Sequence, residues 1–101
     1  MAKAKNINEK LSAKDKARID ELFLKALGNR INGLILKKYN SIYQFWVERS
    51  EILISRAGLN YILHGQREPK ITTLRLIAEA LDMTLDDLLD FDDPAPPYTE
   101  G

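Results

Sequence analysis

Apolar residues recur at three- and four-residue steps along most of the chain, the spacing of helices that bury one face. The first two runs comprise Ile19, Leu22, Phe23, Ala26 and Leu27, followed by Ile31, Leu34 and Ile35. Gly28 separates these runs, and glycine destabilises a helix interior by ~1 kcal/mol relative to alanine, so we expect a break or bend there. No segment alternates with a period of two for long enough to form a strand. The pattern therefore predicts an all-α fold.

Two short helices are predicted in the middle of the chain, joined by a tight connector. Ser41 is a good N-cap, and Gln44 three residues later completes a capping-box pattern, so a helix is expected over 41–49. Ser55 caps the next helix. Gly65 ends it, because glycine readily adopts the left-handed backbone that follows a helix.

Two further helices are predicted in the C-terminal part of the chain. Pro69 lies in a polar loop and prevents the preceding helix from continuing. The next helix is expected to start near Thr72. Thr84 caps a fifth helix, with Asp86 and Asp87 in its first turn, where negative charge suits the helix dipole. The core is closed by Leu85, Leu88 and Leu89.

Charge is distributed unevenly, although the 101 residues have no net charge. Residues 1–40 hold ten Lys/Arg and four Asp/Glu, whereas residues 83–101 hold six Asp/Glu and no Lys or Arg. Zero net charge therefore does not argue against a nucleic-acid partner, because binding responds to the local patch. The expected organisation is a flexible basic arm (1–11), an N-terminal helical extension (12–26), a main domain (27–91) and an acidic, proline-rich tail (92–101).

Several classes of function are excluded by residue content. The chain has no cysteine and one histidine, so it lacks a disulfide framework, a thiolate zinc site and a multi-histidine metal site. The aspartates near the C-terminus lack the spacing of a calcium-binding loop. No phosphate-binding glycine loop and no paired nucleophile and base appear. We therefore expect no enzyme activity, no cofactor, no metal and no membrane association, in a cytoplasmic protein.

The helices expected at 41–49 and 55–64 form a candidate helix-turn-helix, in which the second helix enters the DNA major groove. Helical periodicity turns Leu59, Ile62 and Leu63 inward, which leaves the base-facing side to Arg56, Ala57, Asn60, Tyr61 and His64. An arginine can donate two hydrogen bonds to guanine, an asparagine can pair with adenine, and an alanine can touch a thymine methyl. Phosphate contacts are expected from Ser55, Gln66, Arg67 and Lys70.

Four outward residues carry alternative interpretations. Arg56 and Asn60 either contact bases or are solvated surface residues. Tyr61 either contacts phosphate or sugar or stacks on the helix surface. His64 either caps the end of the helix or meets a phosphate. Gly58 is unfavourable in a helix, but it allows a close approach to the backbone.

The run SRAGLNYILHGQREPKITTLRLIAEALDMTLDDLL, from Ser55 to Leu89, combines a capping serine, inward apolar residues, a terminating glycine and a loop proline. It resembles the lambda-repressor-like (Cro or XRE-type) helix-turn-helix family without a gap. The resemblance extends over roughly Leu27–Leu89. It implies a five-helix domain, here with an extra N-terminal helix, a bacterial or phage origin, and dimeric binding to double-stranded DNA at a palindromic site.

The sequence departs from the family pattern at three places. The spacing from Phe45 to Ser55 is about three residues longer than usual, so the turn between helices two and three is expanded. Ile42 stands where the family often has a phosphate-contacting glutamine. Gln44 follows two residues later and is kept as a candidate contact. The family's internal Arg–Glu pair is replaced by two apolar residues, Ile35 and Leu63, which predicts a hydrophobic contact.

These features predict a sequence-specific DNA-binding transcriptional regulator. Dimerisation is expected because one recognition helix gives limited affinity, and the amphipathic segment 12–26 is a candidate interface. The alternative is a protein-interaction module, such as an antitoxin or adaptor, on the same scaffold. Charge around Arg56, Arg67 and Lys70 discriminates between them, since a positive face favours DNA and an apolar or acidic face favours a protein.

Overall fold

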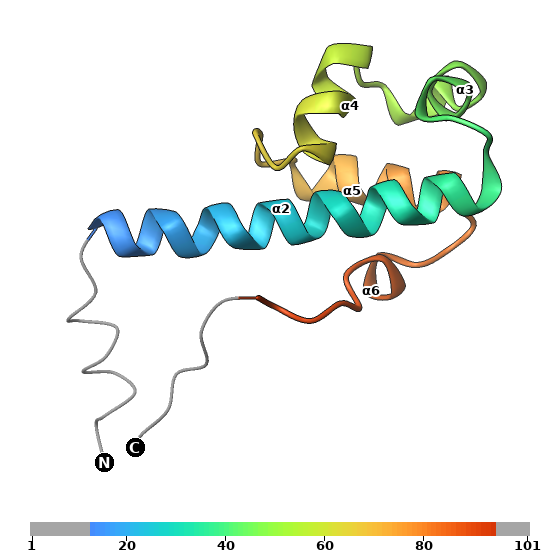
Figure 1. Cartoon of the computed structure of the whole chain (residues 1–101). Coiled ribbons are helices and arrows are strands. Elements are labelled where there is room, and N and C mark those ends of the chain that lie inside the picture. Colours follow the sequence, from blue (N-terminus) through green and yellow to red (C-terminus); the bar gives the residue numbers. More distant parts are fainter. Residues whose placement is uncertain (1–12, 95–101) are drawn as a thin grey trace.

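The computed structural model describes residues 13–94, and within this range the chain is built of helices without strands (Figure 1). The predicted all-α fold is confirmed. The elements are α2 (Ala13–Lys38), α3 (Ile42–Glu48), a 3-10 helix η1 (Ser50–Ile52), α4 (Arg56–Leu63), α5 (Ile71–Ala80) and α6 (Leu85–Leu88). The predicted basic arm at 1–11 and the tail beyond residue 94 lie outside the described residues.

α2 is one continuous helix, so the bend predicted at Gly28 is wrong. Gly28 is buried, and a Cβ placed on it would collide with the backbone carbonyls of Ile62 and Leu63 at the end of α4. The glycine therefore serves close packing between two helices, which outweighs its weak helix propensity. The predicted helical extension is the first half of α2, and its turns project beyond the other helices (Figure 1).

One stripe of α2 forms the floor of the core. Leu27, Ile31 and Ile35 are buried at successive helical turns. They share a single cluster with buried side chains of the other elements, which include Phe45, Ile52, Leu59, Ile62, Leu63, Ile77 and Leu88. Ile35 and Leu63, the two apolar replacements, are thus both buried in this core. The backbone of Leu63 lies against Gly28, which is about two helical turns from Ile35 along α2, so a direct contact between the Ile35 and Leu63 side chains stays a prediction.

Most helix ends follow the predicted capping residues. The hydroxyls of Ser41, Ser55 and Thr84 each accept a hydrogen bond from the first turn of the helix that follows. Gly65 takes the left-handed backbone (φ 70°), and the backbone N–H groups of residues 65 and 66 return to α4 in the pattern that closes a helix. α5 begins at Ile71, one residue before the predicted start, and no side chain caps it.

Two basic residues of α2 hold the ends of the C-terminal helices. Arg30 donates through Nη2 to the Asp87 carbonyl (2.7 Å) and through Nε to the Leu88 carbonyl (3.2 Å). Lys38 donates to the Leu81 carbonyl (2.8 Å) where α5 ends. Cations at helix C-termini satisfy orphan carbonyls and favour the dipole. α2 therefore fixes α5 and α6 by polar contacts as well as by its apolar stripe.

Candidate nucleic-acid interface

α4 divides into a buried face and an exposed face, as its periodicity predicts. Leu59, Ile62 and Leu63 are buried together with Gly58. The residues predicted to face DNA are all exposed, namely Arg56, Ala57, Asn60, Tyr61 and His64. Packing of α4 on α2 therefore fixes which side chains a partner can reach. In Figure 1, α4 lies at one side of the molecule above α2.

The N-terminus of α4 is anchored by a hydroxyl and an indole. The Oγ atom of Ser55 accepts a hydrogen bond from the Gly58 N–H (2.9 Å), which leaves the hydroxyl hydrogen free to donate. Just before it, the Nε1 atom of Trp46 donates to the Ile54 carbonyl (2.9 Å). Trp46 is half-buried and packs against the hydrophobic core, so its role is structural.

The expanded turn before α4 has a defined conformation. It contains η1 and then Leu53, which adopts the left-handed region (φ 56°) although it is not glycine. Ile52 is buried in the core, whereas Leu53 is 84% exposed. The additional residues are thus accommodated by a short 3-10 turn, with Ile52 as its inward anchor and Leu53 directed to solvent.

Arg56 lies against an aromatic residue that the sequence analysis did not select. Its guanidinium carbon lies 4.6 Å from the centroid of the Tyr43 ring, across the gap between α3 and α4. The Tyr43 ring in turn lies 6.1 Å from that of Trp46. In the sequence, Tyr43 is recognisable only as a tyrosine in the first turn of the predicted helix. The fold places it beside Arg56.

Arg67 is brought from the loop onto α4 itself. Its guanidinium lies 5.0 Å from the centroid of the Tyr61 ring. Its Nη1 atom lies 3.0 Å from the position that a Cβ on Gly58 would occupy. The Ile54 side chain and Ser55 Oγ lie equally near that position, so the close approach predicted at Gly58 is made by groups within the protein. A second positive charge therefore joins Arg56 on the exposed side of α4.

The C-terminal end of α4 is organised by His64. Its Nδ1 atom lies 2.7 Å from the Asn60 carbonyl, and because a carbonyl only accepts, Nδ1 carries the hydrogen. The predicted capping role of His64 is confirmed. A phosphate contact from His64 stays a prediction. Gln66 and Lys70 are exposed in the loop that follows.

Gln44 acts in the capping arrangement at the start of α3. The side-chain Oε1 atom of Gln44 accepts a hydrogen bond from the backbone N–H of Asn40 (2.6 Å). The backbone N–H of Gln44 donates to Ser41 Oγ (3.0 Å). The predicted capping pattern is present, with the glutamine reaching one residue further back than the cap. A DNA contact from Gln44 stays a prediction.

The positively charged residues near α4 take no part in the ion pairs found among the described residues. Those pairs use Lys38, Arg49 and Arg75 as cations. Arg49 also donates from Nε to the Tyr39 hydroxyl (2.7 Å), and this hydrogen bond raises the pKa of a guanidinium that is already protonated. Arg56, Arg67 and Lys70 are exposed and outside these pairs, so their charge is available to a partner.

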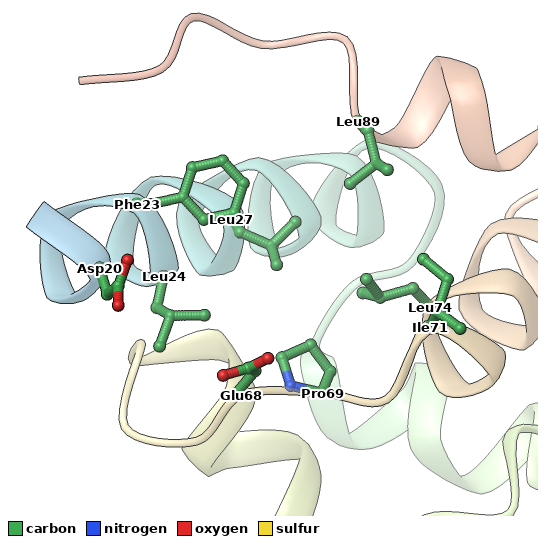
Figure 2. A pocket seen from close by; sticks show the side chains of 9 residues that line it. All are labelled: Asp20, Phe23, Leu24, Leu27, Glu68, Pro69, Ile71, Leu74 and Leu89. Atoms are coloured by element: carbon green, nitrogen blue, oxygen red, sulfur yellow. The ribbon is translucent and has the colours of Figure 1, made fainter. Parts of the chain in front are cut away.

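An apolar groove lies away from the exposed face of α4. It has a volume of about 510 Å³ and runs between α2, the loop before α5 and the start of α5 (Figure 2). Phe23, Leu24 and Leu27 form one wall, and Pro69 and Ile71 form the other. Ile71 is 59% exposed. Of the nine residues that line this groove, three come from the N-terminal segment of α2, namely Asp20, Phe23 and Leu24.

Other kinds of site find no support in the described range. Residues 13–94 contain no group of His, Cys, Asp and Glu side chains arranged to hold a metal ion. In the same residues, no helix combines the length and apolar character needed to cross a membrane.

Comparison with known proteins supports the sequence resemblance. A family model described as helix-turn-helix matches residues 50–88, which span η1, α4, α5 and α6. The match begins at the expanded turn and leaves α2 and α3 outside it. No curated protein and no solved structure matches the chain. The matched segment includes the capped α4 and its exposed face, and it supports the resemblance of this part of the chain to the lambda-repressor-like (Cro/XRE-type) helix-turn-helix family.

Proposed function

We propose that the protein is a sequence-specific DNA-binding transcriptional regulator without enzymatic activity, acting in the cytoplasm. The observation that carries this proposal is the exposed face of α4, where Arg56, Ala57 and Asn60 stand on a helix whose opposite face is buried. A helix held in this way presents base-reading side chains at fixed positions, as insertion into a major groove requires.

The roles within the site follow from side-chain chemistry. Arg56 donates to a guanine, Asn60 pairs with an adenine, and Ala57 contacts a thymine methyl group. Ser55, Gln66, Arg67 and Lys70 contact phosphates and set the register, and Tyr61 adds a sugar or phosphate contact. Each phosphate neutralised by a lysine or arginine contributes a slope of about −0.9 to the dependence of log affinity on log salt concentration.

Selection of bound sequences from random double-stranded DNA tests the proposal. The intact protein enriches a defined site, and Arg56→Ala combined with Asn60→Ala abolishes that enrichment. Arg75→Ala is the charge-matched control, because Arg75 is exposed on α5 and its replacement removes one positive charge, as the replacement of Arg56 does. Failure of the intact protein to enrich any site overturns the proposal.

We further propose that DNA binding involves a homodimer formed through the apolar groove and residues 12–26. Symmetric dimers read two half-sites and so gain affinity that a single recognition helix lacks. The groove supports this because Phe23 and Leu24 lie in the first half of α2 and line the groove together with the exposed Ile71 (Figure 2). A second copy would cover this apolar surface.

The oligomeric state as a function of concentration tests the dimer, measured by light scattering. Ile71→Asp introduces a charge into the groove at the first position of α5, where an acidic residue suits the helix dipole. It therefore dissociates the dimer while leaving the fold intact. Leu36→Asp is the control, because Leu36 is 48% exposed on α2 and lies outside the groove. A wild-type protein that stays monomeric at high concentration contradicts the dimer.

The same groove favours a second candidate function, a protein-interaction module such as an antitoxin or adaptor. An apolar surface of this kind fits a protein partner as well as a second copy. The two functions separate experimentally, because an interaction module enriches no DNA site and loses its partner on Ile71→Asp. A DNA regulator enriches a site, and it loses that site when Arg56→Ala is combined with Asn60→Ala.

A further inference from the structure

The aromatic pair of α3 has no role in the family resemblance, yet it touches the residue expected to read DNA. Trp46 donates its indole N–H to the Ile54 carbonyl, immediately before the cap of α4. Tyr43 lies beside Trp46 on the same helix, and the Arg56 guanidinium lies over the Tyr43 ring. A continuous set of contacts thus runs from the expanded turn, through two aromatic rings, to the first residue of α4.

We propose that Tyr43 is a positioning residue that holds the Arg56 side chain in its DNA-reading pose and thereby helps to determine sequence specificity. This inference rests on the proposed function and deepens it. Tyr43 need not touch a base. It acts through Arg56, by holding the guanidinium over its ring, 4.6 Å from the ring centroid, while the guanidinium N–H groups donate to DNA.

Preorganisation is the physical reason for this role. An exposed arginine has many rotamers, and fixing them on binding reduces affinity. A guanidinium already held over a ring has lost part of that freedom before DNA arrives, and its planar fork of N–H groups suits two hydrogen bonds to guanine. Because Tyr43 is 51% exposed, this contact contributes little to the core, and its removal leaves the fold standing.

The expanded turn gives a reason why the Tyr43–Arg56 contact matters in this protein. A longer connection between α3 and α4 allows more relative motion of the two helices than a short one. The contacts from Trp46 to Ile54 and from Tyr43 to Arg56 span this connection on its outer side. They tie the N-terminus of α4 to α3, while Ile52 anchors the turn from the core side.

Binding measurements with three variants test the proposal on the enriched DNA site and on the same site with the guanine replaced. Tyr43→Ala weakens binding to the preferred site by roughly two- to five-fold, the range expected for one exposed cation–π contact. It has no effect on the substituted site, so selectivity falls. Tyr43→Phe keeps the ring and retains wild-type selectivity. In an Arg56→Ala background, Tyr43→Ala has no further effect, because the two residues act as one unit.

A second measurement does not depend on DNA. In the free protein, the Arg56 side-chain protons show an upfield NMR shift from the Tyr43 ring, which Tyr43→Ala abolishes and Tyr43→Phe preserves. Thermal melting of each variant controls for the fold.

The possible failures are distinguishable. If the wild-type protein selects no site, the proposed function and this role both fall. If it selects a site and Tyr43→Ala keeps full selectivity, only the positioning role is overturned. Equal losses for Tyr43→Phe and Tyr43→Ala also overturn it, since they assign the effect to a direct contact from the hydroxyl. Absence of the ring-current shift in the wild type removes its structural basis.

Discussion

Two glycines in the same helix provide a sharp test of how α2 and α4 pack. Gly28 and Gly33 both lie inside α2, so replacing either with alanine improves intrinsic helix propensity by ~1 kcal/mol. Their surroundings differ. A Cβ on Gly33 meets no atom within 4 Å, whereas a Cβ on Gly28 lies 2.7 Å from the Ile62 carbonyl oxygen and closer still to that of Leu63.

The same substitution is therefore expected to have opposite effects at the two positions. Gly33→Ala stabilises the protein by ~0.5–1 kcal/mol. Gly28→Ala forces α4 away from α2, and overpacking of this kind costs ~1–3 kcal/mol, towards the upper end here because rigid backbone opposes the new atom. After the gain in helix propensity, the net loss is about 2 kcal/mol.

Urea and thermal unfolding of the full chain, followed by circular dichroism at 222 nm, measure both changes. A difference of 1 kcal/mol shifts the Tm of a domain this small by roughly 4–8 °C, so the two variants should melt on opposite sides of the wild type. A Gly28→Ala protein as stable as the wild type would refute the close packing of α2 on α4. Destabilisation by Gly33→Ala would refute the continuous helix.

Three further predictions concern stability, each measured by the same unfolding experiments. Leu63→Glu places a carboxylate at a buried position and should destabilise strongly; an unchanged Tm contradicts the core assignment. Arg30→Ala removes two hydrogen bonds to the carbonyls that end α6 and should cost about 1–2 kcal/mol, while Arg18→Ala, at an exposed position of α2, should have little effect. Leu53→Gly relieves a left-handed backbone at an exposed residue and should stabilise by about 0.5–1 kcal/mol; a loss of stability contradicts the conformation of the turn.

Predictions that depend on near neighbours in the chain agree well with the structure. The caps at Ser41, Ser55 and Thr84 and the terminating Gly65 are present, because each works through hydrogen bonds to residues a few positions away. The exposed face of α4 follows from helical periodicity in the same way. The family match over residues 50–88 confirms the resemblance carried by this segment.

The prediction at Gly28 failed for a reason that local reasoning cannot supply. Propensity treats a glycine as a weak point in a helix, and it contains no information about a partner helix from another part of the chain. Here the missing side chain is what lets the end of α4 approach α2. Packing between distant segments therefore keeps α2 a single helix, where local propensity predicts a break.

The sequence by itself determined the helices, their caps and the outward residues of α4, because these depend on periodicity and on short-range hydrogen bonds. Only the tertiary structure decided which distant groups meet. It placed Arg67 over Tyr61 and Arg56 over Tyr43, and it directed Arg30 of α2 to the end of α6. Contacts between residues far apart in the chain depend on how the helices pack, and a one-dimensional pattern does not contain that arrangement.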